Sequence, residues 1–76
     1  MKNVKISLKS LDEIKEFNKI TCAFDSPVDL VMGNYKVNAK SLIGLFTVDT
    51  NTNVDLNIHS DNYKDYLSSI GKFLVD

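Results

Sequence analysis

The residues with the clearest chemical potential are Lys40 and Ser41, which lie where an alternating apolar run turns into a helical pattern. A hydroxyl at a helix start is well placed to carry a phosphate, because free backbone N–H groups and the helix dipole favour an anion there. The neighbouring ammonium adds a further positive charge. The pair therefore predicts a phosphorylation site. The same serine also suits a purely structural N-cap, and the sequence leaves both interpretations open.

Two further residues have reactive side chains, and a structural interpretation is available for each. His59, the single histidine, is expected on the polar face of a strand as a solvated side chain. Its neighbours Ser60 and Asp61 do not complete a catalytic triad, because adjacent strand residues point in opposite directions. Cys22 has no second cysteine to pair with and is expected to be a reduced structural thiol. With no metal-ligand spacing and no phosphate-binding or dinucleotide motif, we expect no metal, no cofactor and no enzymatic activity.

Composition predicts a single domain spanning residues 1–76. The chain is 43% hydrophobic and 25% charged, as in ordinary globular proteins. The net charge is -1 and every basic residue is lysine, which disfavours nucleic-acid binding. No apolar run approaches the roughly 20 residues that span a bilayer, and the start of the chain does not follow the signal-peptide pattern. We therefore expect a cytoplasmic protein with no membrane partner.

The elements that must position these residues follow from apolar periodicity, which predicts the order βαββαβα. Ser10 and Glu13 have capping-box spacing at the first helix, and Gly33 with Asn34 suits a tight hairpin. Because each element has one apolar face, we predict an α+β open-faced two-layer sandwich: a four-stranded antiparallel sheet covered on one face by three helices. The predicted elements are strand 4–8, helix 11–23, strands 28–32 and 35–39, helix 41–48, strand 54–58 and a last helix with an apolar stripe from Tyr63 to Leu74.

The short helix after Ser41 holds more large apolar residues than one face can bury. Leu42, Ile43 and Phe46 are spaced so that they do not all point inward on so short a helix. We call these three residues the apolar patch. With Lys40 beside it, the patch is a candidate protein-binding surface, and the alternative is an ordinary core and surface without a partner.

The sequence around Ser41 resembles HPr, the histidine-containing phosphocarrier protein of the bacterial sugar phosphotransferase system. Residues 37–44 read VNAKSLIG, similar to the family's V-N-A-K-S-I-M-G stretch, and residues 65–70 read DYLSSI, similar to its D-A-L-x-x-L pattern. The resemblance implies the HPr-like form of the predicted sandwich. It also implies that Ser41 corresponds to the regulatory serine that HPr kinase phosphorylates, and that the apolar patch docks onto protein partners.

The turn before the first helix departs from the family pattern. HPr carries its phosphoryl group on a histidine in a G-L-H-A-R-P-like turn, whereas residues 8–13 here read LKSLDE. In lacking that histidine but keeping the serine, the chain is similar to the catabolite-repression paralogue of HPr. The resemblance therefore implies a regulatory binding module without phosphohistidine carrier activity, whose partner is an HPr kinase or a transcriptional or metabolic regulator.

Two alternatives stay open. One is a phosphocarrier with a non-standard acceptor, His59 or Ser10. Against Ser10, a serine phosphate is a stable ester, and the carboxylates of Asp12 and Glu13 would repel the incoming anion. The other alternative is a constitutive protein-interaction domain without phosphorylation. The sequence makes no prediction of the oligomeric state.

Overall fold

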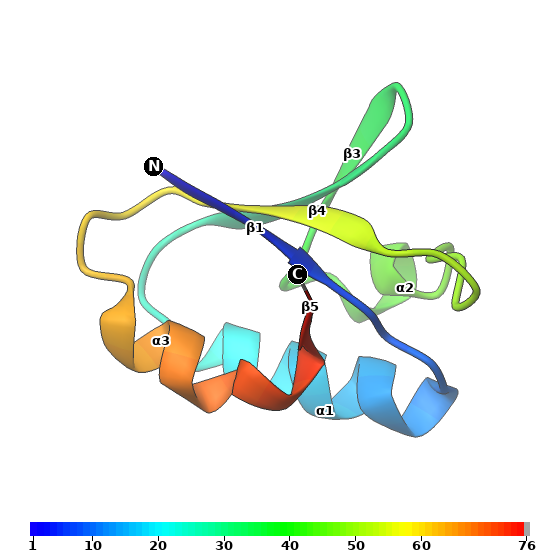
Figure 1. Cartoon of the computed structure of the whole chain (residues 1–76), viewed down its shortest axis with the longest axis horizontal. Coiled ribbons are helices and arrows are strands. Elements are labelled where there is room, and N and C mark those ends of the chain that lie inside the picture. Colours follow the sequence, from blue (N-terminus) through cyan, green and yellow to red (C-terminus); the bar gives the residue numbers. More distant parts are fainter. Residues whose placement is uncertain (76) are drawn as a thin grey trace.

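The computed structural model describes residues 1–75, and in it helices cover one face of an antiparallel sheet (Figure 1). This confirms the predicted α+β class with three α-helices. Along the chain the elements are β1 (Lys2–Ile6), α1 (Leu11–Cys22), β2 (Val28–Met32), β3 (Tyr35–Asn38), α2 (Leu42–Leu45), β4 (Val54–Ile58), α3 (Lys64–Ser69), the one-turn 3-10 helix η1 (Gly71–Phe73) and β5 (Leu74–Val75).

The sheet has the strand order β3-β2-β4-β1-β5, and every recorded pairing is antiparallel. Leu56 of β4 lies opposite both Val4 of β1 and Leu30 of β2. Alternation along these strands sends Leu30 and Leu56 to the same face, where both are fully buried. The register therefore aligns one continuous apolar face for the helices to cover.

The prediction of four strands is wrong, because the chain after α3 adds β5 beside β1. Gly71 favours a helix less than any residue except proline, and α3 ends before it at Ser69. The η1 turn then brings the Phe73 carbonyl to the Ser7 N–H, at 2.8 Å, and Leu74 pairs with Ile6. The predicted last helix is therefore too long. It ends at Ser69, and Leu74 belongs to a strand.

Other element boundaries also differ from the prediction, and two of them by one residue only, since helix 11–23 ends at Cys22 and strand 35–39 ends at Asn38. The first strand is Lys2–Ile6, so Leu8 lies beyond the strand although it is fully buried as expected. The helix after Ser41 ends at Leu45 instead of continuing to residue 48. Its end tightens into shorter turns, with the Thr47 hydroxyl donating to the Gly44 carbonyl at 2.7 Å. By contrast, the Gly33 turn is the predicted tight hairpin, with φ of 62° at the glycine and Met32 opposite Tyr35.

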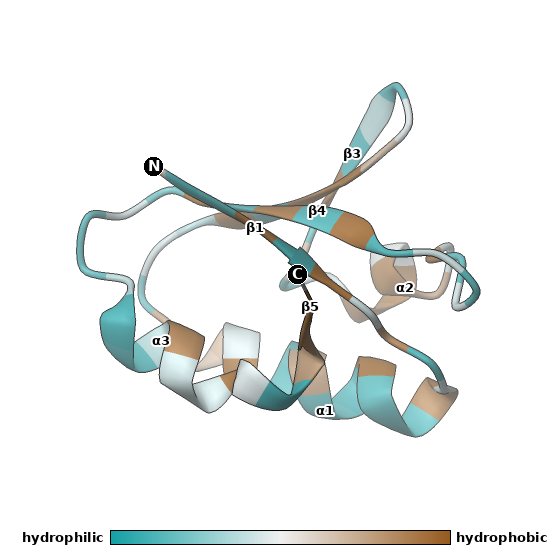
Figure 2. Ribbon diagram, in the orientation of Figure 1, coloured by the Kyte–Doolittle hydropathy of each residue, from teal (hydrophilic) through white to brown (hydrophobic). Residues whose placement is uncertain are grey.

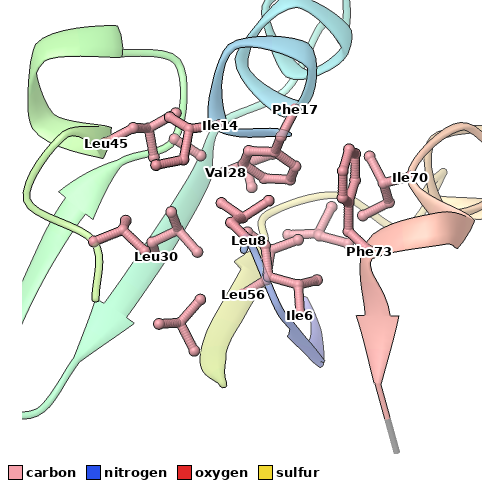
Figure 3. Close-up of a cluster of buried hydrophobic side chains, with 14 of the residues drawn as sticks. Ile6, Leu8, Ile14, Phe17, Val28, Leu30, Leu45, Leu56, Ile70 and Phe73 are labelled. Atoms are coloured by element: carbon pink, nitrogen blue, oxygen red, sulfur yellow. The ribbon is translucent and has the colours of Figure 1, made fainter. Parts of the chain in front are cut away.

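The core lies between the sheet and the helices, and Figure 3 shows side chains from all layers meeting there. The rings of Phe17 on α1 and Phe73 on η1 contact edge to face, with centroids 5.9 Å apart. Leu45 of α2 and Ile14 of α1 belong to the same buried cluster. Apolar and polar residues alternate along α1 and β4 (Figure 2), as expected for elements with one buried face.

The other face of the sheet carries a row of polar cross-strand pairs. Asn3 donates to Asn57 at 2.6 Å, and the Lys5 ammonium contacts the Asp55 carboxylate at 2.9 Å. These partners are directly opposite in the β1–β4 register. Such exposed pairs add little stability, but they fit the prediction that this face is open to water.

One hydrogen bond is buried between α1 and α3. The Thr21 and Tyr66 hydroxyls lie 2.7 Å apart, and both residues are at least nine-tenths buried. The ring of Tyr66 stacks on Phe24, with centroids 4.5 Å apart. This hydrogen bond joins the two helices. Because both side chains are buried, each hydroxyl depends on the other for its hydrogen-bond partner.

We predict that Thr21→Val and Tyr66→Phe are not additive. Each single substitution leaves a buried hydroxyl unpaired and should lower the free energy of unfolding by about 1–3 kcal/mol. The double variant removes both hydroxyls and should lose clearly less than the sum of the two single losses. Urea unfolding of the four proteins measures this, and strict additivity would contradict the pairing.

Stability should also fall at high pH because of Tyr66. Burial raises the pKa of Tyr66 from 10.0 to about 12, outweighing the Thr21 hydrogen bond, which lowers it. Folding therefore favours the neutral phenol, and this contribution is full below about pH 10 and disappears as the pH rises through about 12. Between those limits the unfolding free energy should fall by about 3 kcal/mol more than in Tyr66→Phe. Tyr35→Phe, which changes an exposed tyrosine, should behave like the unmodified protein.

Candidate functional site

Ser41 is the N-cap of α2. Its backbone is extended, with φ of −92° and ψ of 106°, and its hydroxyl accepts the Gly44 N–H at 3.3 Å. The Ser41 carbonyl accepts the Leu45 N–H at 3.0 Å. The serine itself is exposed. Its oxygen thus has a structural role in the cap while it stays open to solvent.

The segment before Ser41 is fastened to α1 by three hydrogen bonds. The Asn18 amide donates to the Ala39 carbonyl at 3.3 Å, and the Cys22 thiol donates to the Lys40 carbonyl at 3.4 Å. In the opposite direction, the Lys40 ammonium donates to the Phe24 carbonyl at 2.5 Å, just beyond the end of α1. The sequence predicts Lys40 to be a partner-binding residue. In the structure its half-buried side chain is turned toward α1.

The three residues of the apolar patch are buried to different extents. Leu42 is half-buried and packs against the core, while the next-turn residue Leu45 is fully buried. Ile43 is 82% exposed and Phe46 is 49% exposed. Two large apolar side chains therefore face solvent within five residues of the exposed Ser41. Leu11, at the start of α1 and 52% exposed, is a further apolar surface residue that sequence analysis did not single out.

The turn before α1, where the resemblance would place a carrier histidine, forms a helix cap. The Ser10 hydroxyl accepts the Glu13 N–H at 3.2 Å, and the Glu13 carboxylate accepts the Lys9 N–H at 2.9 Å. This is the predicted capping arrangement, with the carboxylate reaching the N–H one residue before the cap. The side chains at this turn therefore place carboxylates, not an imidazole, at the beginning of α1.

His59 lies at the other end of the molecule. It follows β4, whose last residue Ile58 pairs with Lys2, whereas α1 begins beyond Ile6 at the opposite end of β1 (Figure 1). Its ring nitrogen Nε2 lies 2.8 Å from the Asp29 carboxylate on the open face of the sheet. The prediction that His59 is exposed on the polar side is confirmed, but the residue follows β4 instead of lying in a strand, and it has Asp29 as a partner that the sequence did not identify.

The described chain offers little else that resembles a small-molecule site. A hollow of about 500 Å³ lies between the end of α1 and the start of α3. The hollow is lined by Ala23, Phe24, Asp25, Asn62, Lys64, Asp65 and Tyr66. Within residues 1–75, no three His, Cys, Asp or Glu side chains gather as metal ligands. No helix in that range is long and apolar enough to cross a membrane.

Comparison with solved structures identifies proteins with the same fold. HPr-C-His from Thermoanaerobacter tengcongensis is 25% identical with a TM-score of 0.79, over 95% of this chain and 89% of that one. The phosphocarrier protein HPr from Bacillus anthracis is 19% identical with a TM-score of 0.74, over 97% and 94% of the two chains. No protein-family model and no curated protein matches the sequence.

A third structure is that of Crh, the Bacillus subtilis catabolite-repression protein, described as a swapped, intertwined dimer. It is 26% identical with a TM-score of 0.66, over 96% of this chain and 90% of Crh. Together with the residues quoted above, these similarities identify the chain as HPr-like.

We predict that Ser41→Ala lowers the free energy of unfolding by about 1 kcal/mol, because the Gly44 N–H loses its side-chain acceptor. Ser41→Asp retains an acceptor at the cap and should lose less. Ser68→Ala, an exposed serine substitution inside α3, is the matched control and should leave stability nearly unchanged. Thermal unfolding of the three variants tests this, and an equal loss in Ser41→Ala and Ser68→Ala would rule out the cap.

Proposed function

We propose that this HPr-like protein is a non-catalytic regulatory binding module of the cytoplasm, whose apolar patch docks onto a protein partner under the control of Ser41 phosphorylation. The observation that carries the proposal is the exposure of Ile43, at 82%, within two residues of the exposed Ser41 hydroxyl. A side chain of this size in water loses hydrophobic free energy that a partner can recover. A phosphate on Ser41 places negative charge beside Ile43 and so changes the surface charge that a partner needs in order to bind there.

The arrangement at the start of α1 supports the absence of carrier activity. A carrier needs an acceptor whose phosphorylated form transfers the group onward, and phosphohistidine meets that need better than a serine ester. The Ser10 hydroxyl instead caps α1, beside the carboxylates of Asp12 and Glu13. Those carboxylates oppose the approach of a phosphoryl group through charge repulsion. His59 stands at the other end of β4 and is paired with Asp29.

The proposed modification is an ordinary phosphoryl transfer from ATP. The Ser41 oxygen attacks the γ-phosphorus, the bond to the β-phosphate oxygen breaks, and ADP leaves while a base of the kinase takes the hydroxyl proton. The product carries a charge of about −1.5 to −2 at neutral pH. Because every basic residue of this chain is a lysine, bidentate recognition of that phosphate by arginine must come from the partner.

In this proposal the patch and the serine have separate roles. Ile43 and Phe46 supply contact area that does not depend on modification, and the phosphate adds or removes affinity according to the charge of the partner surface. A partner with a basic rim binds the phosphorylated form more tightly. A partner with an acidic rim is released by phosphorylation.

We expect HPr kinase with ATP to add one phosphate, which intact mass shows and which Ser41→Ala abolishes. Ile43→Ser should lower kcat/KM for this phosphorylation by about tenfold or more, because the kinase loses the contact with the patch. Tyr35→Ser, which removes another large exposed side chain, 48% exposed and located on β3, is the control and should react normally. Equal rates for Ile43→Ser and Tyr35→Ser would contradict a role of the patch in docking to the kinase.

Phosphoenolpyruvate and the first enzyme of the phosphotransferase system should leave the protein unlabelled. An acid-labile phosphate that disappears in His59→Ala would instead establish a histidine carrier. An acid-stable phosphate that disappears in Ser10→Ala would establish transfer to the cap serine. If HPr kinase also fails to label Ser41 while the patch still binds a regulator, the protein is a constitutive interaction domain.

A further inference from the structure

Lys40, the residue before Ser41, contacts the backbone just beyond the end of α1. Its ammonium donates to the Phe24 carbonyl, 16 residues earlier in the chain, at 2.5 Å. The Phe24 N–H is already bonded to the Thr21 carbonyl as α1 ends. A lysine at this place stabilises the helix end, where backbone carbonyls lack partners and the helix dipole is negative. In the unmodified protein the ammonium therefore has a neutral acceptor.

A phosphate on Ser41 would be a stronger acceptor for the same ammonium. The present bond already has an ionised donor, so the gain would come from the ionised acceptor, whose negative charge attracts the ammonium directly. The lysine side chain has a flexible four-carbon stem and three rotatable donors. The Ser41 backbone is extended and its side chain is exposed, so the ammonium would reach the phosphate by rotation of this stem away from Phe24.

The backbone around Lys40 is held independently of its ammonium. Asn18 fastens the Ala39 carbonyl and Cys22 fastens the Lys40 carbonyl. The Ala39 N–H is bonded to the Val28 carbonyl at 2.8 Å. These three contacts do not involve the lysine side chain. The side chain is therefore able to change acceptor while the backbone of the segment stays on α1.

We propose that Lys40 transfers its ammonium from the Phe24 carbonyl to the phosphate when Ser41 is phosphorylated, and so transmits the modification to the end of α1. This deepens the proposed function and rests on it for its biological setting. Lys40 is a positioning residue in this scheme. It is not a direct contact for the partner in the unmodified state.

The residues at the end of α1 make contacts that the loss of the Lys40 hydrogen bond would affect. Phe24 is half-buried, and its ring stacks on that of Tyr66. Phe24 and Asp25 line the hollow of about 500 Å³ between α1 and α3. Loss of the ammonium from the Phe24 carbonyl frees that backbone group beside the hollow. Phosphorylation would thereby alter a place that is distinct from the apolar patch.

The test uses the full chain with phosphoserine installed at position 41 by genetic encoding, and reads the carbonyl ¹³C shift of Phe24 by NMR. We expect the phosphate to move this resonance to the value found in unphosphorylated Lys40→Met. In Lys40→Met itself, phosphoserine should move it no further. Lys36→Met, a substitution at an exposed lysine on β3, should leave both the resonance and its response unchanged. Lys40→Arg keeps a cation and should respond to the phosphate.

Three results would overturn the proposal. The Phe24 resonance could stay fixed on phosphorylation, it could respond equally in Lys40→Met, or it could be unaffected by Lys40→Met without phosphate. Amide spectra of each variant establish that the fold is retained. Because no kinase or partner is present, the outcome does not depend on whether Ser41 is phosphorylated in cells. The kinase and docking experiments above decide that separate question.

Discussion

The inner face of the sheet is apolar along most of its width, and it has to be covered by a twelve-residue α1 and a six-residue α3. The remaining gap is filled by the segment from Ala39 to Leu45, whose two end residues are fully buried. Once Leu45 points inward on so short a helix, Ile43 has to point outward. The exposed patch is thus a geometric consequence of covering the sheet. The packing of the core therefore determines which large apolar side chains of α2 stay exposed.

Local patterns in the sequence were enough to predict most of the fold. The α1 cap, the Gly33 hairpin and the alternation in β2 and β4 depend on residues close together in the chain, and the structure has all of them. β5 was missed because a strand of two residues has no measurable periodicity. Leu74 also continues the helical spacing from Ile70, so only the weak helix propensity of Gly71 argued for an earlier end.

The site was less predictable because its contacts join distant residues. Ser41 as a helix cap follows from its neighbours, and the structure shows that bond. The acceptor of the Lys40 ammonium is a backbone carbonyl, and no side-chain pattern identifies it. The contact between His59 and Asp29 depends on how β2 and β4 align, which sequence alternation alone does not specify. Such contacts become visible only when the register and packing are known.

The position of β1 has a consequence for the order in which the chain assembles. β1 pairs with β4 and β5, both of which come much later in the sequence. During synthesis on the ribosome, β1 therefore waits for partners that lie about 50 residues later or more. The β2–β3 hairpin can close from its own residues well before that. Native pairing of β1 is consequently a step that follows translation of β4 and β5, with a long loop to close and a correspondingly slow search.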